Sequence, residues 1–324
     1  MKAIVVRKHG GPEVLERAEL PLPEPASGQV RVALRAIGIN RRDSFIRTGV
    51  YQRKLPLILG IEGAGIVDGI GPDVTGWRNG DRVVYYVPDR LGSYAEYQAV
   101  PASRLARLPD ELSFQQAAAI FDHGLTAHYL SHTTFPLRKG HRILIQAAAG
   151  GVGALLVQFA KRLGATVYGT VSTAQKADLI RALGVDHAIN YRDTDFVEAI
   201  AKLTDGQGVD VVYDSVGKDT FEGSARGLAR RGMLVLYGQS SGPVESINPT
   251  ELADLGSLFF TRPHLLDHIA SKEELEQRSQ DVFGWLLRGE ITVNIDKVYP
   301  LSDVAEAHRQ LDDRSRSGKI LLIP

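Results

Sequence analysis

The sequence predicts an α/β protein with a doubly wound parallel sheet and a second, mainly antiparallel β domain. Its 324 residues predict about two domains, at roughly 150 residues per domain. Strand-like and helix-like segments alternate through the middle of the chain, which is typical of a parallel sheet covered by helices. Residues 1–120 instead hold short alternating runs punctuated by proline and glycine. These runs favour a compact antiparallel domain.

The wound half begins with the aliphatic run 142–145, which predicts a strand. From Gly151 onward, apolar residues recur at three- and four-residue spacing up to Leu163, as in a helix with one buried face, and Gly164 marks its end. Asp193 or Thr194 is the expected N-cap of a later helix, and Gly232 an expected break. The further elements are strands at 166–171, 187–189, 209–213 and 233–237, with helices around 179–183, 196–203 and 221–228.

The two ends of the chain differ from its middle. Strands are expected at 30–34, 65–67 and 82–85, and the alternation lapses after Thr261. Beyond that point we expect two helices, at 273–280 and 281–287, and a last strand at 319–323. This short final segment is expected to return to the first domain.

The composition excludes several kinds of site. Lysine plus arginine number 38 and aspartate plus glutamate number 38, so the formal net charge is zero and nucleic acid is not expected as the main ligand. The chain contains no cysteine, which excludes disulfides, thiolate nucleophiles, iron–sulfur clusters and cysteine-bound zinc. Any metal would depend on histidine and carboxylate ligands alone.

One uncharged segment, residues 143–160, has the length of a candidate membrane span. Its central glycines would weaken a single helix, so a strand, a turn and a helix are predicted there, and no membrane span is expected. The sequence starts with an apolar run at residues 3–6, shorter than the roughly seven residues that a secretory signal needs. We therefore expect a cytoplasmic protein.

The turn at 147–153 (AAAGGVG) lies between a predicted strand and a predicted helix. On the pattern G-x-G-x-x-G, its key positions are Ala148, Gly150 and Gly153, so alanine replaces the first glycine. Gly150 would let the backbone approach a pyrophosphate, and Gly153 would let helix and strand pack closely. Gly151 and Val152 begin the helix, whose N-terminus favours anions. The turn predicts a dinucleotide site; the alternative is a tight turn without a ligand.

The adenosine end of this site favours NADPH. An NAD site usually has Asp or Glu about 20 residues after the motif, but here the strand ends in Val171, Ser172 and Thr173. Hydroxyl groups and a cation suit a 2′-phosphate, which a carboxylate would repel. Lys176 is the expected cation, and the alternative is a solvated surface lysine.

Several motifs of the chain resemble the zinc-free NADPH:quinone oxidoreductases of the medium-chain dehydrogenase/reductase superfamily, which include zeta-crystallin. The resemblance covers nearly the whole chain. It implies a GroES-like catalytic domain, residues 1–122 plus 263–324, with a Rossmann NADPH-binding domain, residues 123–262, inserted in it. The motifs are 38–43 (GINRRD), 60–65 (GIEGAG), 80–83 (GDRV), 124–127 (GLTA), 147–153, 173–176 (TAQK), 189–192 (INYR), 213–217 (YDSVG) and 321–324 (LLIP).

The same resemblance also indicates whether the chain has the zinc ligands of the superfamily. Zinc alcohol dehydrogenases of the superfamily have G-H-E-x-x-G where this chain has GIEGAG, so Ile61 replaces the ligand histidine. No metal site is expected. Without a Lewis acid, oxidation of ordinary alcohols is not expected, whereas reduction of an electrophilic quinone or enone is.

By resemblance, Asn40 and Tyr51 line the quinone side of the site and Thr126 approaches the nicotinamide. Two positions depart from the family pattern: Phe45 stands where a tyrosine is expected, and His123 where lysine is more familiar. A structural role for His123 is as well supported as proton donation. The resemblance also places Lys176, Tyr191 and Arg314 at the 2′-phosphate and adenine end, and Gly238, Ser240 and Arg262 near the nicotinamide or the edge of the cleft.

The resulting hypothesis is metal-free, NADPH-dependent reduction of a quinone in the cleft between the domains. A reductase of enones or alkenals with the same fold is the nearest alternative, and a non-catalytic RNA-binding or structural role is the second. The apolar segment 257–261 is strand-like and is expected at the edge of the wound sheet. Because such edges are commonly covered by a partner, a homodimer is expected.

Overall fold

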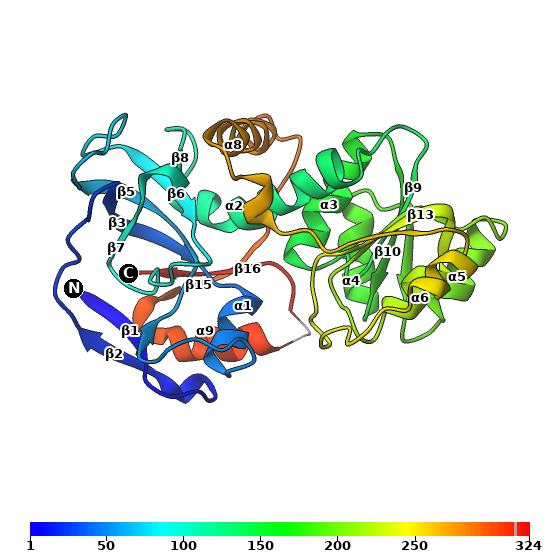
Figure 1. The fold of residues 1–324 in the computed structure, drawn as a ribbon, viewed down its shortest axis with the longest axis horizontal. Coiled ribbons are helices and arrows are strands. Elements are labelled where there is room, and N and C mark those ends of the chain that lie inside the picture. Colours follow the sequence, from blue (N-terminus) through cyan, green and yellow to red (C-terminus); the bar gives the residue numbers. More distant parts are fainter. Residues whose placement is uncertain (314–315) are drawn as a thin grey trace. The chain divides into compact units, whose positions relative to one another are not determined.

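The computed structural model describes residues 1–313 and 316–324, and its chain forms two compact units (Figure 1). The first unit combines Met1–Asp122 with Ser271–Pro324, and the second is His123–Ala270. Residues 263–270 therefore group with the second unit. The helix α2, Phe114–Tyr129, contains the point at which the first unit ends and the second begins.

The first unit is built on a seven-stranded, mainly antiparallel sheet with the order β15-β16-β3-β5-β6-β8, to which β7 adds by pairing with β3. The final strand β16 pairs with β3 at Leu321↔Gly38, so the C-terminal segment belongs to this unit. A smaller sheet has the order β2-β1-β4. The strands are β1 Lys2–Val6, β2 Leu15–Glu19, β3 Gln29–Gly38, β4 Leu57–Ile58, β5 Glu62–Ile70, β6 Arg82–Tyr86, β7 Tyr97–Pro101, β8 Leu105–Arg107, β15 Ile295–Pro300 and β16 Lys319–Ile323.

The α-helices that lie wholly within the described part of this unit are α1 Arg41–Arg47, α8 Lys272–Leu287 and α9 Val304–Asp312. The expectation of two helices at 273–280 and 281–287 was wrong, because α8 is continuous. Ser271 caps it by accepting a hydrogen bond from the Glu274 amide. No glycine or proline separates the two expected halves, so nothing interrupts the helix there.

The second unit has a six-stranded parallel sheet with the order β11-β10-β9-β12-β13-β14. This is the strand order of a doubly wound dinucleotide-binding fold, and it confirms the predicted fold class. Helices lie on both faces of the sheet (Figure 1). The elements are β9 Arg142–Ile145, α3 Gly151–Arg162, β10 Thr166–Val171, α4 Ala174–Ala182, β11 His187–Asn190, α5 Phe196–Leu203, β12 Val209–Asp214, α6 Phe221–Arg226, β13 Leu228–Leu236, α7 Pro249–Asp254 and β14 Phe259–Thr261.

Two local predictions in this unit were wrong. The N-cap of α5 is Asp195, whose Oδ1 accepts from the amides of Val197 and Glu198, rather than Asp193 or Thr194. Gly232 does not break the chain, because it lies within β13. The pairing of β12 with β13 shifts register around residues 229–232, so the strand absorbs the glycine as an irregularity.

Within the described ranges, 1–313 and 316–324, the structure contains no helix of the length and apolar character that crossing a membrane requires. The uncharged run 143–160 is divided between β9, the turn that follows it, and α3.

Candidate functional site

The turn after β9 is held against the neighbouring strand. The Ala147 amide donates to Thr170 Oγ1 at 3.1 Å, and the Ala148 amide donates to the Thr170 carbonyl at 3.0 Å. Ala147 itself adopts a left-handed conformation, with φ of 53°. Gly150 is the N-cap of α3. The strand, turn and helix that the sequence predicted here are therefore confirmed.

The glycines of this turn differ in how closely their neighbours pack. A Cβ atom on Gly153 would lie 2.6 Å from the Ala147 carbonyl oxygen, and one on Gly151 would lie 2.3 Å from the His123 ring. His123, which departs from the family pattern, therefore packs on the turn. Gly150 has less crowded surroundings, with the Ala147 oxygen 3.1 Å from its added Cβ.

This turn fits the phosphates of a dinucleotide. The first amides of a helix have no partner within it, so those of Gly151, Val152 and Gly153 are directed at the N-terminal end of α3. The helix dipole favours negative charge at this end. The residues thus supply the donors that a pyrophosphate needs.

Ser172, Lys176 and Tyr191 lie near one another at the same edge of the parallel sheet. The Tyr191 amide donates to the Val171 carbonyl at 3.1 Å, which places the end of β11 beside the end of β10. Thr173 caps α4, its Oγ1 accepting from the Lys176 amide at 3.2 Å. Tyr191 is 50% exposed, so its ring is open to a ligand.

Gly238 and Ser240 follow β13 and lie against the end of β12. The Ser240 amide donates to the Ser215 carbonyl at 3.1 Å, and a Cβ on Gly238 would lie 2.5 Å from the same oxygen. Only glycine allows this approach. Thr126 is buried on α2, Arg262 follows β14, and Arg314 lies outside the described residues.

In the first unit, Asn40 is joined to a buried ion pair that the sequence did not reveal. Lys319 Nζ lies 2.5 Å from Glu62 Oε1 and donates to Asn40 Oδ1 at 2.7 Å, while Asn40 Nδ2 donates to Glu62 Oε1 at 2.7 Å. The Glu62 side chain is fully buried and that of Lys319 is 2% exposed. Both ends of the Asn40 amide are thus engaged.

A second buried carboxyl, Asp43, lies beside this ion pair. Its Oδ2 accepts from the Asn40 amide at 2.9 Å and from the Tyr94 hydroxyl at 3.2 Å. Burial raises the pKa of Asp43 to about 7; the Glu62 charge also raises it, whereas the Asn40 hydrogen bond and the Lys319 charge lower it. The Asp43 carboxyl group is therefore partly protonated near neutral pH.

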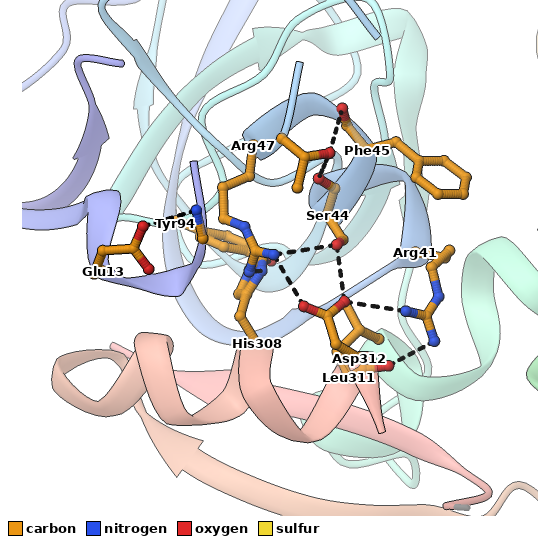
Figure 2. Close-up of polar contacts among 11 residues, drawn as sticks. Glu13, Arg41, Ser44, Phe45, Arg47, Tyr94, His308, Leu311 and Asp312 are labelled. Carbon is orange, nitrogen blue, oxygen red and sulfur yellow. Dashed lines mark hydrogen bonds and ion pairs between the residues drawn. The ribbon is translucent and has the colours of Figure 1, made fainter. Parts of the chain in front are cut away.

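Figure 2 shows how the cluster continues from α1 to α9. Arg47 Nη1 lies 2.9 Å from His308 Nδ1, and Tyr94 Oη lies 3.0 Å from His308 Nε2. Because arginine only donates, Nδ1 accepts and Nε2 carries the hydrogen. Burial, reinforced by the Arg47 charge, lowers the pKa of His308 to about 3. The ring is neutral at physiological pH.

Asp312 completes the connection between the two helices. Its Oδ2 accepts from Arg47 Nη2 at 2.9 Å, and its Oδ1 accepts from Ser44 Oγ at 2.9 Å and Arg41 Nη1 at 3.1 Å. These bonds hold α1 against α9 (Figure 2). They fix the helix that begins directly after Asn40.

Tyr51 lies just beyond α1 and is half-buried. Its ring centroid is 5.3 Å from that of Phe45 in an edge-on arrangement, and the Arg42 guanidinium carbon lies 5.6 Å from the Tyr51 centroid. Phe45, which replaces an expected tyrosine, therefore packs against Tyr51.

Ile61 is 1% exposed, and the described part of the chain contains no group of three histidine or carboxylate side chains arranged to hold a metal.

Two family models match the chain. The model described as "alcohol dehydrogenase GroES-like domain" matches residues 26–110, and that described as "zinc-binding dehydrogenase" matches residues 151–283. These matches fall in the two units of the structure.

Full-length relatives carry names of two related activities. Quinone oxidoreductase 1 of Escherichia coli is 45% identical over 99% of each chain, and 2-haloacrylate reductase of a Burkholderia species is 40% identical over 99% of this chain and 98% of its own. The solved structure of Escherichia coli quinone oxidoreductase complexed with NADPH covers 100% of both chains at 44% identity, with a TM-score of 0.96.

Proposed function

Because the chain belongs to the quinone oxidoreductase family, we propose that it is an NADPH-dependent oxidoreductase that reduces quinones. The observation that carries this proposal is the turn at 147–153, which opens the N-terminus of α3 to a pyrophosphate beside the edge that bears Lys176. The NADPH complex of a relative over the full chain supports the choice of cofactor.

In this proposal, Gly150, Gly151, Val152 and Gly153 hold the pyrophosphate through backbone amides. Lys176 pairs with the 2′-phosphate, Tyr191 covers the adenine, and Ser172 and Thr173 line the same end. Gly238, Ser240 and Arg314 complete the cofactor side, and Thr126 approaches the nicotinamide. When bound, NADPH supplies a hydride to an electrophilic acceptor.

The contacts of Asn40 define its role in the proposal. Both ends of its amide are bonded, to Glu62 and to Lys319, so we assign Asn40 to positioning the start of α1. Tyr51 is the side chain that orients the acceptor, and the edge of Phe45 limits where its ring can lie.

We propose that the reaction requires no zinc. Ile61 has no donor atom at the position that zinc enzymes of the superfamily fill with histidine, and the chain has no cysteine. These are properties of the ligand set itself. Reduction of an acceptor that is already electrophilic depends less on a Lewis acid than alcohol oxidation does.

Reduction of activated alkenes is the second candidate, favoured by the 40% identity to a 2-haloacrylate reductase. Quinones and enones are both flat, conjugated electrophiles. Turnover of 1,4-benzoquinone and of a simple 2-enone, each with NADPH, separates the two candidates. We expect the quinone to react faster; activity confined to the enone would refute the first choice.

A homodimer through β14 is part of the proposal. This strand lies at the end of the sheet order, paired to β13, and Phe259 is 56% exposed on it.

A cytoplasmic location stays a prediction. RNA binding stays the non-catalytic alternative, and filter binding to single-stranded RNA with and without NADPH tests it.

A further inference from the structure

The two-electron reduction of a quinone to a hydroquinone needs a proton as well as a hydride. The residues assigned so far bind the cofactor or orient the acceptor, and no proton donor has yet been assigned. A donor must carry an exchangeable hydrogen at neutral pH and must be open to a ligand.

Three carboxyl groups of the first unit lie around the Lys319 ammonium, and they differ in access. Glu62 and Asp43 are fully buried; Glu62 is ion-paired and Asp43 accepts two hydrogen bonds. Asp122 is half-buried, so it is the member of this group with surface left exposed by the protein.

Asp122 is held at the cluster by its backbone, because its amide donates to Glu62 Oε2 at 3.4 Å. Glu62 in turn bonds Asn40. Within the described residues, the Asp122 carboxyl oxygens accept no hydrogen bond from the protein, which leaves them available. Thr126 follows Asp122 by one turn of α2, so the two side chains lie on the same face of this helix.

We propose that Asp122 is the proton donor of the reduction, an inference that rests on the proposed function. The O–H bond of its carboxylic acid breaks, and a new O–H bond forms on the quinone oxygen as NADPH provides the two electrons with the hydride. The products are a hydroquinone, NADP⁺ and the Asp122 carboxylate, which regains its proton from water.

The surroundings of Asp122 suit this role. The pKa of Asp122 is raised to about 7, mainly by burial; the Glu62 charge on β5 and the Asp43 charge on α1 contribute to the rise, while Lys319 on β16 and Arg42 on α1 oppose it. The group is thus half protonated near neutral pH. The two cations stabilise the carboxylate that remains after transfer.

The test compares Asp122→Asn, which preserves the shape but removes the acid, with Asp110→Asn, whose carboxyl is 93% exposed. We expect kcat for benzoquinone to fall about 100-fold or more in Asp122→Asn alone. The wild-type kcat should decline above about pH 7, and the variant profile should be flat. The Kd of NADPH, measured by fluorescence titration, should change less than about threefold.

A second readout does not depend on turnover. Because Asp43 and Asp122 both have a pKa of about 7, infrared spectra of the purified protein should show two protonated carboxyl groups that titrate in this range, and Asp122→Asn should remove one of them. The inference would be overturned if Asp122→Asn bound NADPH and kept the wild-type kcat and pH dependence, or if its infrared titration were the same as that of the wild type. Either result would leave the proposed function standing. Absence of wild-type activity on both acceptors would instead overturn the proposed function and the inference with it.

Discussion

Lys319 Nζ lies 2.5 Å from Glu62 Oε1, although 257 positions separate the two residues in the sequence. The pair joins β16 to β5 at a point where both side chains are buried. Asn40 bonds both partners. The start of α1 therefore depends on a charge supplied by the C-terminal strand.

The first prediction concerns this ion pair. Replacing Lys319 with methionine keeps the length of the side chain but leaves the Glu62 carboxylate buried without its cation. The free energy of unfolding should fall by about 3–5 kcal/mol, measured by urea denaturation. Lys272→Met, at a side chain 71% exposed on α8, should change it by less than about 0.5 kcal/mol. Equal stability of Lys319→Met and wild type would contradict the assignment.

His308 gives a prediction on pH. Its pKa is about 3 in the folded protein against 6.5 for a free side chain, so the unfolded state binds the additional proton between these values. Stability should therefore fall as the pH drops through this window, by up to about 1.4 kcal/mol per pH unit from this group. His308→Gln should show a shallower acid decline in unfolding experiments. Above pH 7 the two curves should run parallel, and equal slopes below pH 6 would reject the prediction.

A substitution at Lys176 tests whether the site prefers NADPH to NADH. Because its ammonium is assigned to the 2′-phosphate, Lys176→Ala should weaken NADPH by about 10- to 100-fold and leave NADH nearly unchanged. Titration calorimetry with each nucleotide measures this. Lys202→Ala, on the exposed surface of α5, is the matched control. The same loss for both nucleotides would remove Lys176 from the phosphate site.

Gly153 tests the packing of the turn. A methyl group there would meet the Ala147 carbonyl oxygen at 2.6 Å, so Gly153→Ala should cost about 1–3 kcal/mol of stability and weaken NADPH binding. Gly227→Ala is the control, because its nearest atom would be 3.5 Å away. Thermal unfolding and NADPH titration report the two effects. If the Gly153→Ala protein bound NADPH with wild-type affinity, the turn would tolerate a shift of its backbone, and the prediction would be wrong.

Phe259 tests the dimer. A lysine on the β14 edge places charge where a partner strand would pack, so Phe259→Lys should halve the mass measured by light scattering. Leu203→Lys, at another exposed apolar residue of the same unit, should leave the mass unchanged. A wild-type protein that is already monomeric would refute the proposed interface.

The sequence predicted the wound sheet well because its signals are local. The apolar period of α3 and the glycines at its start specify strand, turn and helix within neighbouring residues. Gly164 and Gly206 end their helices with φ of 79° and 76°, as glycine after a helix does. Errors arose where two signals compete, as at Asp195, which caps α5 although Asp193 and Thr194 are equally good capping residues.

The polar cluster of the first unit could not be predicted in the same way. Lys319 stands at the start of an apolar strand, and Glu62 stands in a glycine-rich motif. Neither residue indicates a buried ion pair by itself, because the two come together only when the sheet pairs β16 with β3 and β3 with β5. Such long-range pairing leaves no periodic trace in the sequence. The one available signal of a buried ion pair was Lys319, a charged residue at the start of a strand that is otherwise apolar.

The position of β16 between β15 and β3 also sets an order of events during synthesis. β3 emerges from the ribosome before the second unit, but its neighbour β16 emerges after that unit. The parallel sheet can therefore complete its hydrogen bonding while the first sheet still has an open gap. In that interval Glu62 lacks the ammonium that neutralises it in the finished protein. The nascent first unit must keep this group either hydrated or protonated until residue 319 has left the ribosome.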